Sequence, residues 1–147
     1  MPQPLLLADD DATAELGRRL AAALKPGDLI LLHGDLGAGK TALARSIIRT
    51  LMAEPELDAP SPSFALVQPY EGDGVSVLHT DLYRIRDPRE VDELGLFDRP
   101  ETIVLCEWPE RGDEEFTRRA TGEVTLTIPT EGVGRLAEVT FGDGRSF

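Results

Sequence analysis

The spacing of apolar residues predicts a helix near the start of the chain. Between residues 12 and 24, leucines recur at every fourth position, which places them on one face of an amphipathic helix. A Lys-Pro-Gly turn at residues 25–27 ends this pattern. Asp11 or Thr13 is expected to cap the first turn, because short polar side chains accept hydrogen bonds from the free amides there.

The next apolar segments predict a strand, a loop and a second helix in direct succession. Residues 28–33 form a short Leu/Ile run between a Pro-Gly turn and a glycine, which is typical of a strand buried on both faces. A glycine-rich stretch follows. Over residues 41–52 the apolar positions again fall on one helical face, so we expect the helix to begin where the glycines end.

The remaining segments are mostly extended. Three prolines make residues 54–62 an exposed connection, because proline cannot continue a helix. Two extended segments then flank a short glycine-containing link, which suggests a hairpin. A polar stretch has helical character, a further apolar run fits a central strand, and the tail alternates as a closing antiparallel hairpin. These segments are, in order, 65–70, 75–80, 89–96, 102–106, 123–128 and 135–141.

Length and composition predict one soluble domain over residues 1–147. The chain has enough residues for a single core, with 41% hydrophobic and 29% charged residues. Fifteen basic against twenty-seven acidic residues give a net charge of −12, which disfavours unaided binding to nucleic acid. No signal sequence or membrane-length apolar run is apparent, so an intracellular location is expected. Cys106 is the single cysteine, which excludes an intramolecular disulfide and disfavours a cysteine-based zinc site.

A complete phosphate-binding motif follows the predicted strand of residues 28–33. The pattern G-x-x-x-x-G-K-[ST] is matched by Gly34, Asp35, Leu36, Gly37, Ala38, Gly39, Lys40 and Thr41. Its glycines let successive backbone amides converge on phosphate oxygens, and the following helix adds its positive dipole end. Lys40 is expected to contact the β- and γ-phosphates, and the Thr41 hydroxyl to bind Mg²⁺. The motif therefore predicts binding of ATP or ADP with magnesium.

Two carboxylates are candidates for the chemistry at the phosphates. Glu107 directly follows the predicted strand of residues 102–106, and Asp81 follows another strand in a similar way. Phosphoryl transfer requires a metal ligand and a group that orients the attacking water, and these two residues can divide the roles. Each can equally be an ordinary acidic residue at a strand end. Which of them would orient the water stays open.

Two further polar residues are weaker candidates. Ser63 lies on a segment stiffened by proline and is a candidate for reaching magnesium or the γ-phosphate, although an ordinary turn explains it equally well. His79 is two residues before Asp81 and faces the same side of its strand. A lone imidazole is more often a packed or solvated side chain than a ligand.

Taken together, the motifs resemble the bacterial TsaE (YjeE) family, the ATPase component of the tRNA threonylcarbamoyladenosine system. The resemblance rests on the phosphate loop preceded by histidine and on three later blocks. The blocks are Ser61-Pro62-Ser63-Phe64 with Tyr70, His79-Thr80-Asp81-Leu82-Tyr83-Arg84 and Glu107-Trp108-Pro109-Glu110. They occur in the family's order over nearly the whole chain, while the final hairpin matches only in general character.

The resemblance implies a three-layer α/β fold, P-loop NTPase-like, with a mixed central sheet flanked by helices. It implies Glu107 as the Walker B acid at magnesium, alongside Thr41, and Asp81 as a second essential carboxylate, with Lys40 also serving catalysis. It further implies TsaB and TsaD as partners, with tRNA contacted only through them. One position departs from the family, which usually has threonine where this chain has Ser63. The hydroxyl survives, but the lost methyl loosens its χ1 restriction.

Two other functions share the phosphate loop. A small-molecule kinase would normally need an arginine-bearing lid and an acceptor pocket, and no separate lid is apparent in 147 residues. A nucleotide-dependent binding module would use ATP to order residues 61–64, with hydrolysis incidental. Transfer of label from ATP to an acceptor would favour the kinase. Full function without Glu107 would favour the binding module.

Overall fold

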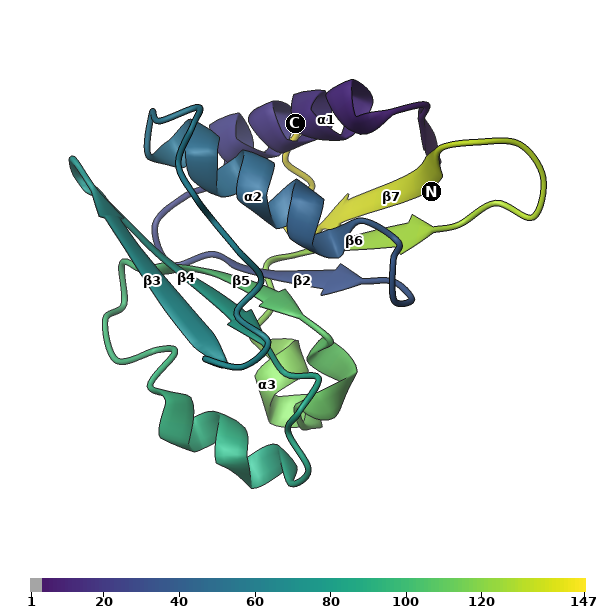
Figure 1. Ribbon diagram of the computed structural model, residues 1–147. Helices are drawn as coiled ribbons and strands as arrows, with labels where there is room; N and C mark the ends of the chain where they lie inside the picture. The colour runs from purple at the N-terminus through teal and green to yellow at the C-terminus, as the bar shows by residue number, and fades with distance from the viewer. Residues whose placement is uncertain (1–3) are drawn as a thin grey trace.

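A seven-stranded mixed sheet runs through the structure, a computed structural model that describes residues 4–147 (Figure 1). The strand order is β1-β7-β6-β2-β5-β4-β3. The inner strands β6, β2, β5 and β4 run parallel to one another, whereas β7 pairs antiparallel with β6 and β1, and β3 pairs antiparallel with β4. The strands are β1 Leu5–Leu7, β2 Leu29–His33, β3 Val67–Gly72, β4 Val75–Asp81, β5 Ile103–Glu107, β6 Gly122–Thr127 and β7 Arg135–Phe141.

Helices cover both faces of this sheet and make three layers (Figure 1). One face carries α1 (Asp10–Ala23) and α2 (Lys40–Leu51). The other carries the 3₁₀ helix η1 (Pro88–Leu94) and the short α3 (Glu114–Arg118). A single 3₁₀ turn, η2 (Pro109–Arg111), follows β5. The predicted three-layer α/β fold with a mixed sheet is therefore confirmed.

Strand β2 is buried on both faces because it lies in the middle of the sheet. Ile30 and Leu32 join the core cluster beneath α1 and α2, while Leu29 and Leu31 join the cluster on the opposite face. This two-sided burial explains why its sequence is continuously apolar and does not alternate. The phosphate motif therefore leaves the sheet from its central, buried strand.

The two helices that cover one face contact each other directly. Ser46 of α2 donates a hydrogen bond from its hydroxyl to the carbonyl oxygen of Ala14 in α1, at 2.8 Å. Leu16 and Leu20 of α1, together with Leu43 and Ile47 of α2, lie in the same buried cluster. The helix that starts at the phosphate loop is thus held between the sheet and α1.

Several element boundaries differ from the sequence prediction. The first helix begins at Asp10, and its cap is Asp9 rather than Asp11 or Thr13, because Asp9 Oδ1 accepts from the Ala12 amide at 2.9 Å. The predicted strand at residues 65–70 starts only at Val67. Leu66 has φ of 68° and closes a turn through its amide to the Pro62 carbonyl at 2.6 Å.

Three elements were not predicted from the sequence, namely β1, η2 and α3. Each is only three to five residues long. Strand β1 pairs with β7, which is more than 120 residues away in sequence. Elements this short depend on such tertiary contacts, because local propensity over so few residues is weak.

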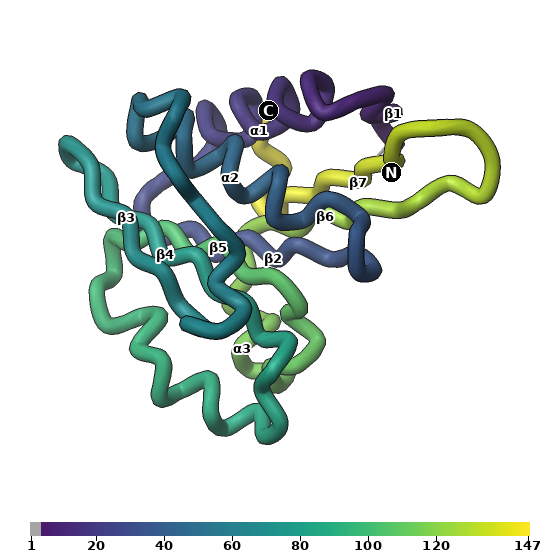
Figure 2. Tube along the Cα trace, in the orientation of Figure 1, coloured from purple at the N-terminus to yellow at the C-terminus, as the bar shows by residue number. Residues whose placement is uncertain are grey.

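The trace in Figure 2 shows two projections from the layered body. The connection between β6 and β7 extends beyond one side of the sheet, and the β3–β4 hairpin turn extends beyond the other. The phosphate loop lies between β2 and α2, at the carboxyl ends of the parallel strands. As for the bilayer, no helix within residues 4–147 has both the length and the apolar character required to span it.

Candidate functional site

The backbone of the phosphate loop takes conformations that favour glycine. Gly34 has φ of 153°, and a Cβ built there would lie 2.8 Å from the Leu126 carbonyl oxygen. Gly39 has φ of 103° and is the N-cap of α2, where no side chain caps the first turn. The amides of that turn are consequently left to an external acceptor, and the dipole of α2 favours an anion at this point.

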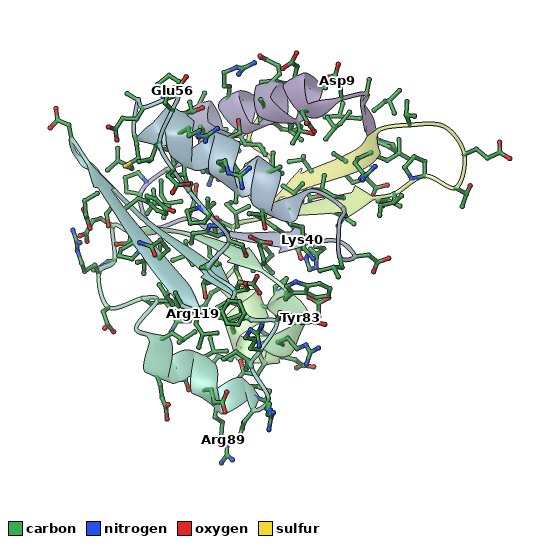
Figure 3. All side chains as sticks on the ribbon, in the orientation of Figure 1. Asp9, Lys40, Glu56, Tyr83, Arg89 and Arg119 are labelled. Atoms are coloured by element: carbon green, nitrogen blue, oxygen red, sulfur yellow. The ribbon has the colours of Figure 1, made fainter. Side chains whose placement is uncertain are left out.

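Lys40 is buried at the start of α2, with its side chain turned back over the loop (Figure 3). Its Nζ donates to the Gly34 carbonyl oxygen and lies 3.4 Å from the centroid of the Trp108 ring. Burial lowers the pKa of Lys40, and nearby carboxylates, with Glu107 the strongest, oppose that shift. An anion placed in the loop would further favour the ammonium form.

Thr41 and Glu107 are in direct contact although 66 residues separate them in sequence. The Thr41 hydroxyl lies 2.9 Å from Glu107 Oε1 and 3.0 Å from Oε2. Glu107 is the last residue of β5 and is 2% exposed. The two oxygen donors that the sequence assigned to magnesium are therefore neighbours.

Asp81 lies directly opposite Glu107 in the sheet. Asp81 ends β4, Glu107 ends β5, and the two are partners in the parallel register. Side chains alternate along a strand, so Asp81 and Val77 face the same side, which is the side covered by α2. The structure thus brings both predicted carboxylates to one end of one sheet face, next to Lys40 and Thr41.

The environment of Asp81 disfavours its charged form. Burial raises the pKa of its carboxyl and is the largest effect, while the hydrogen bond from the Tyr83 amide to Oδ1, at 2.9 Å, lowers it. The charge of Glu107 raises the pKa again. A carboxyl group whose proton affinity is raised at a phosphate site suits a role in handling a proton or a water molecule.

His79 is a member of this cluster that sequence reasoning left among the weak candidates. It is completely buried, and its Nε2 lies 2.7 Å from Glu107 Oε2. The available sequence signal was its position two residues before Asp81 on the same face of β4. The missing information was its partner, which lies 28 residues away in the chain. The other histidine, His33, pairs instead with the exposed Glu123 at 2.8 Å.

The segment that contains Ser63 approaches the same region through a different residue. Ser61 Oγ lies 3.5 Å from Asp81 Oδ2, at the limit of a hydrogen bond. Within the described part of the chain, the Ser63 hydroxyl makes no hydrogen bond. Phe64 is 83% exposed, and the Arg84 guanidinium lies 4.1 Å from its ring centroid. The role proposed for Ser63 stays a prediction.

Aromatic residues border the lysine side of the site. Trp108 has φ of 56°, an uncommon value for a residue with a side chain, and its ring lies over Lys40. Tyr83 packs against it with ring centroids 4.9 Å apart, and Figure 3 shows Lys40 and Tyr83 near each other at this end of the sheet. Trp108 therefore covers the ammonium group of Lys40.

A cavity of about 320 Å³ adjoins the phosphate loop. Its lining combines Gly37 and Gly39 of the loop with Asp9, Thr13 and Arg135. A larger groove of about 640 Å³ lies between α1 and α2 on the outer side and contains none of the candidate catalytic residues. Of these two spaces, the smaller one borders the loop and could receive the rest of a molecule whose phosphates bind there. Across residues 4–147, no three His, Cys, Asp or Glu side chains form a ready metal cluster.

Comparison with known proteins gives one consistent family. The family model of "Threonylcarbamoyl adenosine biosynthesis protein TsaE" matches residues 7–135. Among proteins named "tRNA threonylcarbamoyladenosine biosynthesis protein TsaE", that of Nostoc sp. is 38% identical over 143 residues, covering 92% of this chain and 84% of its own. That of Rickettsia felis is 41% identical over 107 residues, covering 72% of this chain.

The matched lengths differ among these relatives. The alignment spans 62% of the Rickettsia felis protein and 59% of the Rickettsia conorii protein, so this chain matches less than two thirds of either. In the comparison of folds, the crystal structure of Bacillus subtilus YdiB superposes with a TM-score of 0.71, covering 97% of this chain and 89% of that one. At 20% identity, this likeness concerns the fold alone.

Proposed function

This chain belongs to the TsaE family, and from that membership we propose that it binds and hydrolyses ATP in threonylcarbamoyladenosine modification of tRNA. The family identification made from the sequence motifs is confirmed. The name shared by its relatives supports the modification pathway. The site described above supports the nucleotide chemistry.

The contact between Thr41 and Glu107 is the observation that carries the proposal. A glycine-rich turn could bind an anion without any catalytic purpose. Here the hydroxyl of Thr41, the last residue of the motif, lies 2.9 Å from the buried carboxylate of Glu107 at the end of strand β5. Such an arrangement serves a hydrated cation held between protein oxygens and phosphates, as in P-loop nucleotide hydrolases.

Thr41 and Glu107 fit magnesium by their chemistry. Both offer oxygen, which this hard cation prefers, and Mg²⁺ is usually bound by one or two protein groups together with substrate phosphates. When bound, magnesium would neutralise charge on the β- and γ-phosphates. Thr41 and Glu107 would hold the ion, and Lys40 would exchange its bond to the Gly34 carbonyl for one to a phosphate oxygen.

Asp81 is the proposed residue for the attacking water. It lies opposite Glu107 in the register, and its raised pKa allows it to accept a proton more readily than an exposed aspartate. Lys40 would stabilise the negative charge on the transferred group. The 320 Å³ cavity beside Gly37 would hold the nucleoside.

We propose TsaB and TsaD as the partners through which this chain reaches tRNA. A net charge of −12 repels a phosphate backbone, so a direct tRNA complex would lack the electrostatic term that dominates such binding. Docking onto a partner that holds the RNA avoids this difficulty. ATP hydrolysis would then support turnover of the assembled system.

Phosphate release from ATP, measured for the chain alone and with TsaB and TsaD, tests the proposal. We expect slow hydrolysis alone and a clear rise with the partners. Glu107→Gln should abolish the rise, whereas Glu110→Gln, an exposed neighbour, should retain it. Equal rates with and without partners would contradict the partner dependence. Full tRNA modification by Glu107→Gln would show that the chain acts as a nucleotide-dependent binding module.

A further inference from the structure

We propose that His79 is a positioning residue, which donates a hydrogen bond from Nε2 to Glu107 and fixes that carboxylate against Thr41. The inference rests on the proposed function, because it assigns a task to a residue behind the same site. It concerns a side chain that is completely buried.

The position of His79 in β4 places it immediately behind the two carboxylates. In the parallel register His79 pairs with Leu105, two residues before the Asp81–Glu107 pair. Alternation along the strand points His79 to the same face as Asp81. The Nε2 atom of His79 therefore contacts the Glu107 carboxylate from strand β4, while the Thr41 hydroxyl contacts the same carboxylate from helix α2.

The contact is short and fully removed from water. Nε2 and Oε2 are 2.7 Å apart, in the range of hydrogen bonds to a charged acceptor. His79 is 0% exposed and Glu107 is 2% exposed. Water cannot replace either group at this contact, so the carboxylate depends on protein donors for its orientation.

The surroundings of the second ring nitrogen, Nδ1, determine which of the two nitrogens of His79 carries the proton. Within residues 4–147, the buried Nδ1 of His79 has no hydrogen-bond partner. A proton on Nδ1 would be buried without an acceptor, and it would leave the lone pair of Nε2 facing a carboxylate oxygen. The hydrogen-bond network therefore places the proton on Nε2, where it is donated to Glu107.

Packing alone does not account for a histidine at this position. A fully buried imidazole that leaves one nitrogen unpaired fills the space less favourably than an apolar side chain would. What the imidazole adds is a donor of fixed direction. With Oε2 held by His79, the carboxylate cannot rotate about its last bond, and Oε1 stays directed at Thr41.

Two substitutions separate positioning from packing. His79→Leu removes the donor and keeps an apolar core, while His79→Gln restores an N–H near the place of Nε2. For ATP hydrolysis with the partners, we expect His79→Leu to lower kcat by about 10–100-fold, as for residues that orient metal ligands. The KM for Mg·ATP should stay close to the wild-type value, and His79→Gln should recover most of kcat. His33→Gln, at the partly exposed histidine, is the matched control.

A measurement without nucleotide tests the hydrogen bond itself. The chain has two histidines, so ¹⁵N-histidine labelling gives two ring systems in NMR, and His33→Gln assigns them. We expect His79 to show an Nε2–H ring with an unprotonated Nδ1. A ring with its proton on Nδ1 and none on Nε2 would overturn the inference, even if either variant failed to fold.

The two proposals can fail separately. If the chain shows no ATP hydrolysis under any condition, the proposed function fails, and the NMR result still decides the hydrogen bond. If hydrolysis is present and His79→Leu keeps the wild-type kcat, the positioning role is wrong. Equal losses in His79→Leu and His79→Gln would also contradict it, because a donor should rescue the activity.

Discussion

Asp81 and Glu107 are register partners at the ends of two adjacent parallel strands, and both are buried. Burial disfavours the charged form of Asp81 most, and the charge of Glu107 beside it adds to that effect. The pKa of Asp81 is raised accordingly. In the free protein this pair is electrostatically unfavourable, which is expected of a site built to receive a cation.

Replacing Asp81 by asparagine should lower turnover and raise stability at neutral pH. Because its folded pKa lies above the ordinary value of 3.8, Asp81 contributes stability below that value and loses it as the pH rises through the folded pKa. Asparagine still accepts the Tyr83 amide and carries no charge. Chemical denaturation should therefore show the stability of Asp81→Asn rising relative to the wild type as the pH increases above 3.8. A difference in unfolding free energy between Asp81→Asn and the wild type that does not change with pH would contradict the raised pKa of Asp81.

For Asp143→Asn we expect the stability relative to the wild type to change with pH in the opposite direction. Hydrogen bonds from Arg145 lower the pKa of Asp143 to about 2. Such a group contributes stability above its unfolded pKa and loses it as the pH falls through 2. Asp143→Asn should thus lose stability relative to the wild type as the pH rises from about 2 through 3.8, and the difference should change little at higher pH. The two variants should diverge in denaturation midpoints measured in parallel.

Thr41→Val should weaken binding of nucleotide only when magnesium is present. Valine keeps the branched shape of threonine but removes the hydroxyl that contacts Glu107. Loss of one bond to a charged group, about 1.5–3 kcal/mol, corresponds to about 10–100-fold in Kd. Calorimetry with ATP plus magnesium and with ATP plus chelator measures the difference. Thr41→Ser, which retains the hydroxyl, should remain near the wild type; equal losses with and without magnesium would refute the assignment.

Trp108 should report occupation of the phosphate loop. It is the single tryptophan, and its ring lies 3.4 Å from Lys40 Nζ. Movement of the ammonium toward a phosphate would remove this cation–π contact, worth about 0.5–2 kcal/mol, and change the surroundings of the indole. We expect tryptophan emission to change on adding Mg·ATP and not in Lys40→Ala. Unchanged emission at a nucleotide concentration that saturates binding would show that the contact persists.

Arg145→Ala should destabilise the fold by about 1.5–3 kcal/mol, the range for hydrogen bonds to charged groups. Arg145 lies near the end of the chain and forms bonds of 2.6 and 3.1 Å to the buried Asp28, next to β2. Arg118→Ala, which breaks an exposed pair with Glu114, should cost no more than about 0.5 kcal/mol. Denaturant titration compares the two. A smaller loss for Arg145→Ala than for Arg118→Ala would contradict this view of the tail.

The order of strand, phosphate loop and second helix could be predicted because its signals are local. The continuous apolar run before Gly34 and the helical spacing after Lys40 need no distant partner to be interpreted. The same holds for placing Asp81 and Glu107 at strand ends. These positions alone are sufficient to predict both carboxylates near the phosphate loop.

The features of the fold and site that could not be predicted depend on contacts between segments that are distant in the sequence. No sequence pattern indicates that His79 would meet Glu107, or that Trp108 would adopt a positive φ and cover Lys40. The short strand β1 exists because β7 is available to pair with it. Asp9, and not Asp11, is the N-cap of α1. Several neighbouring aspartates could cap the helix, and sequence propensities do not locate a helix start to within one or two residues.

Calorimetric titration with Mg·ATP and Mg·ADP tests most directly whether the loop from Gly34 to Thr41 binds a nucleotide. For the wild type, with or without TsaB and TsaD, we predict a saturable heat with one nucleotide per chain. Lys25→Ala, at the only other lysine, should give the same result, and Lys40→Ala should lose most of the affinity. Absence of heat from either nucleotide with folded wild-type protein, alone or with its partners, would contradict the account.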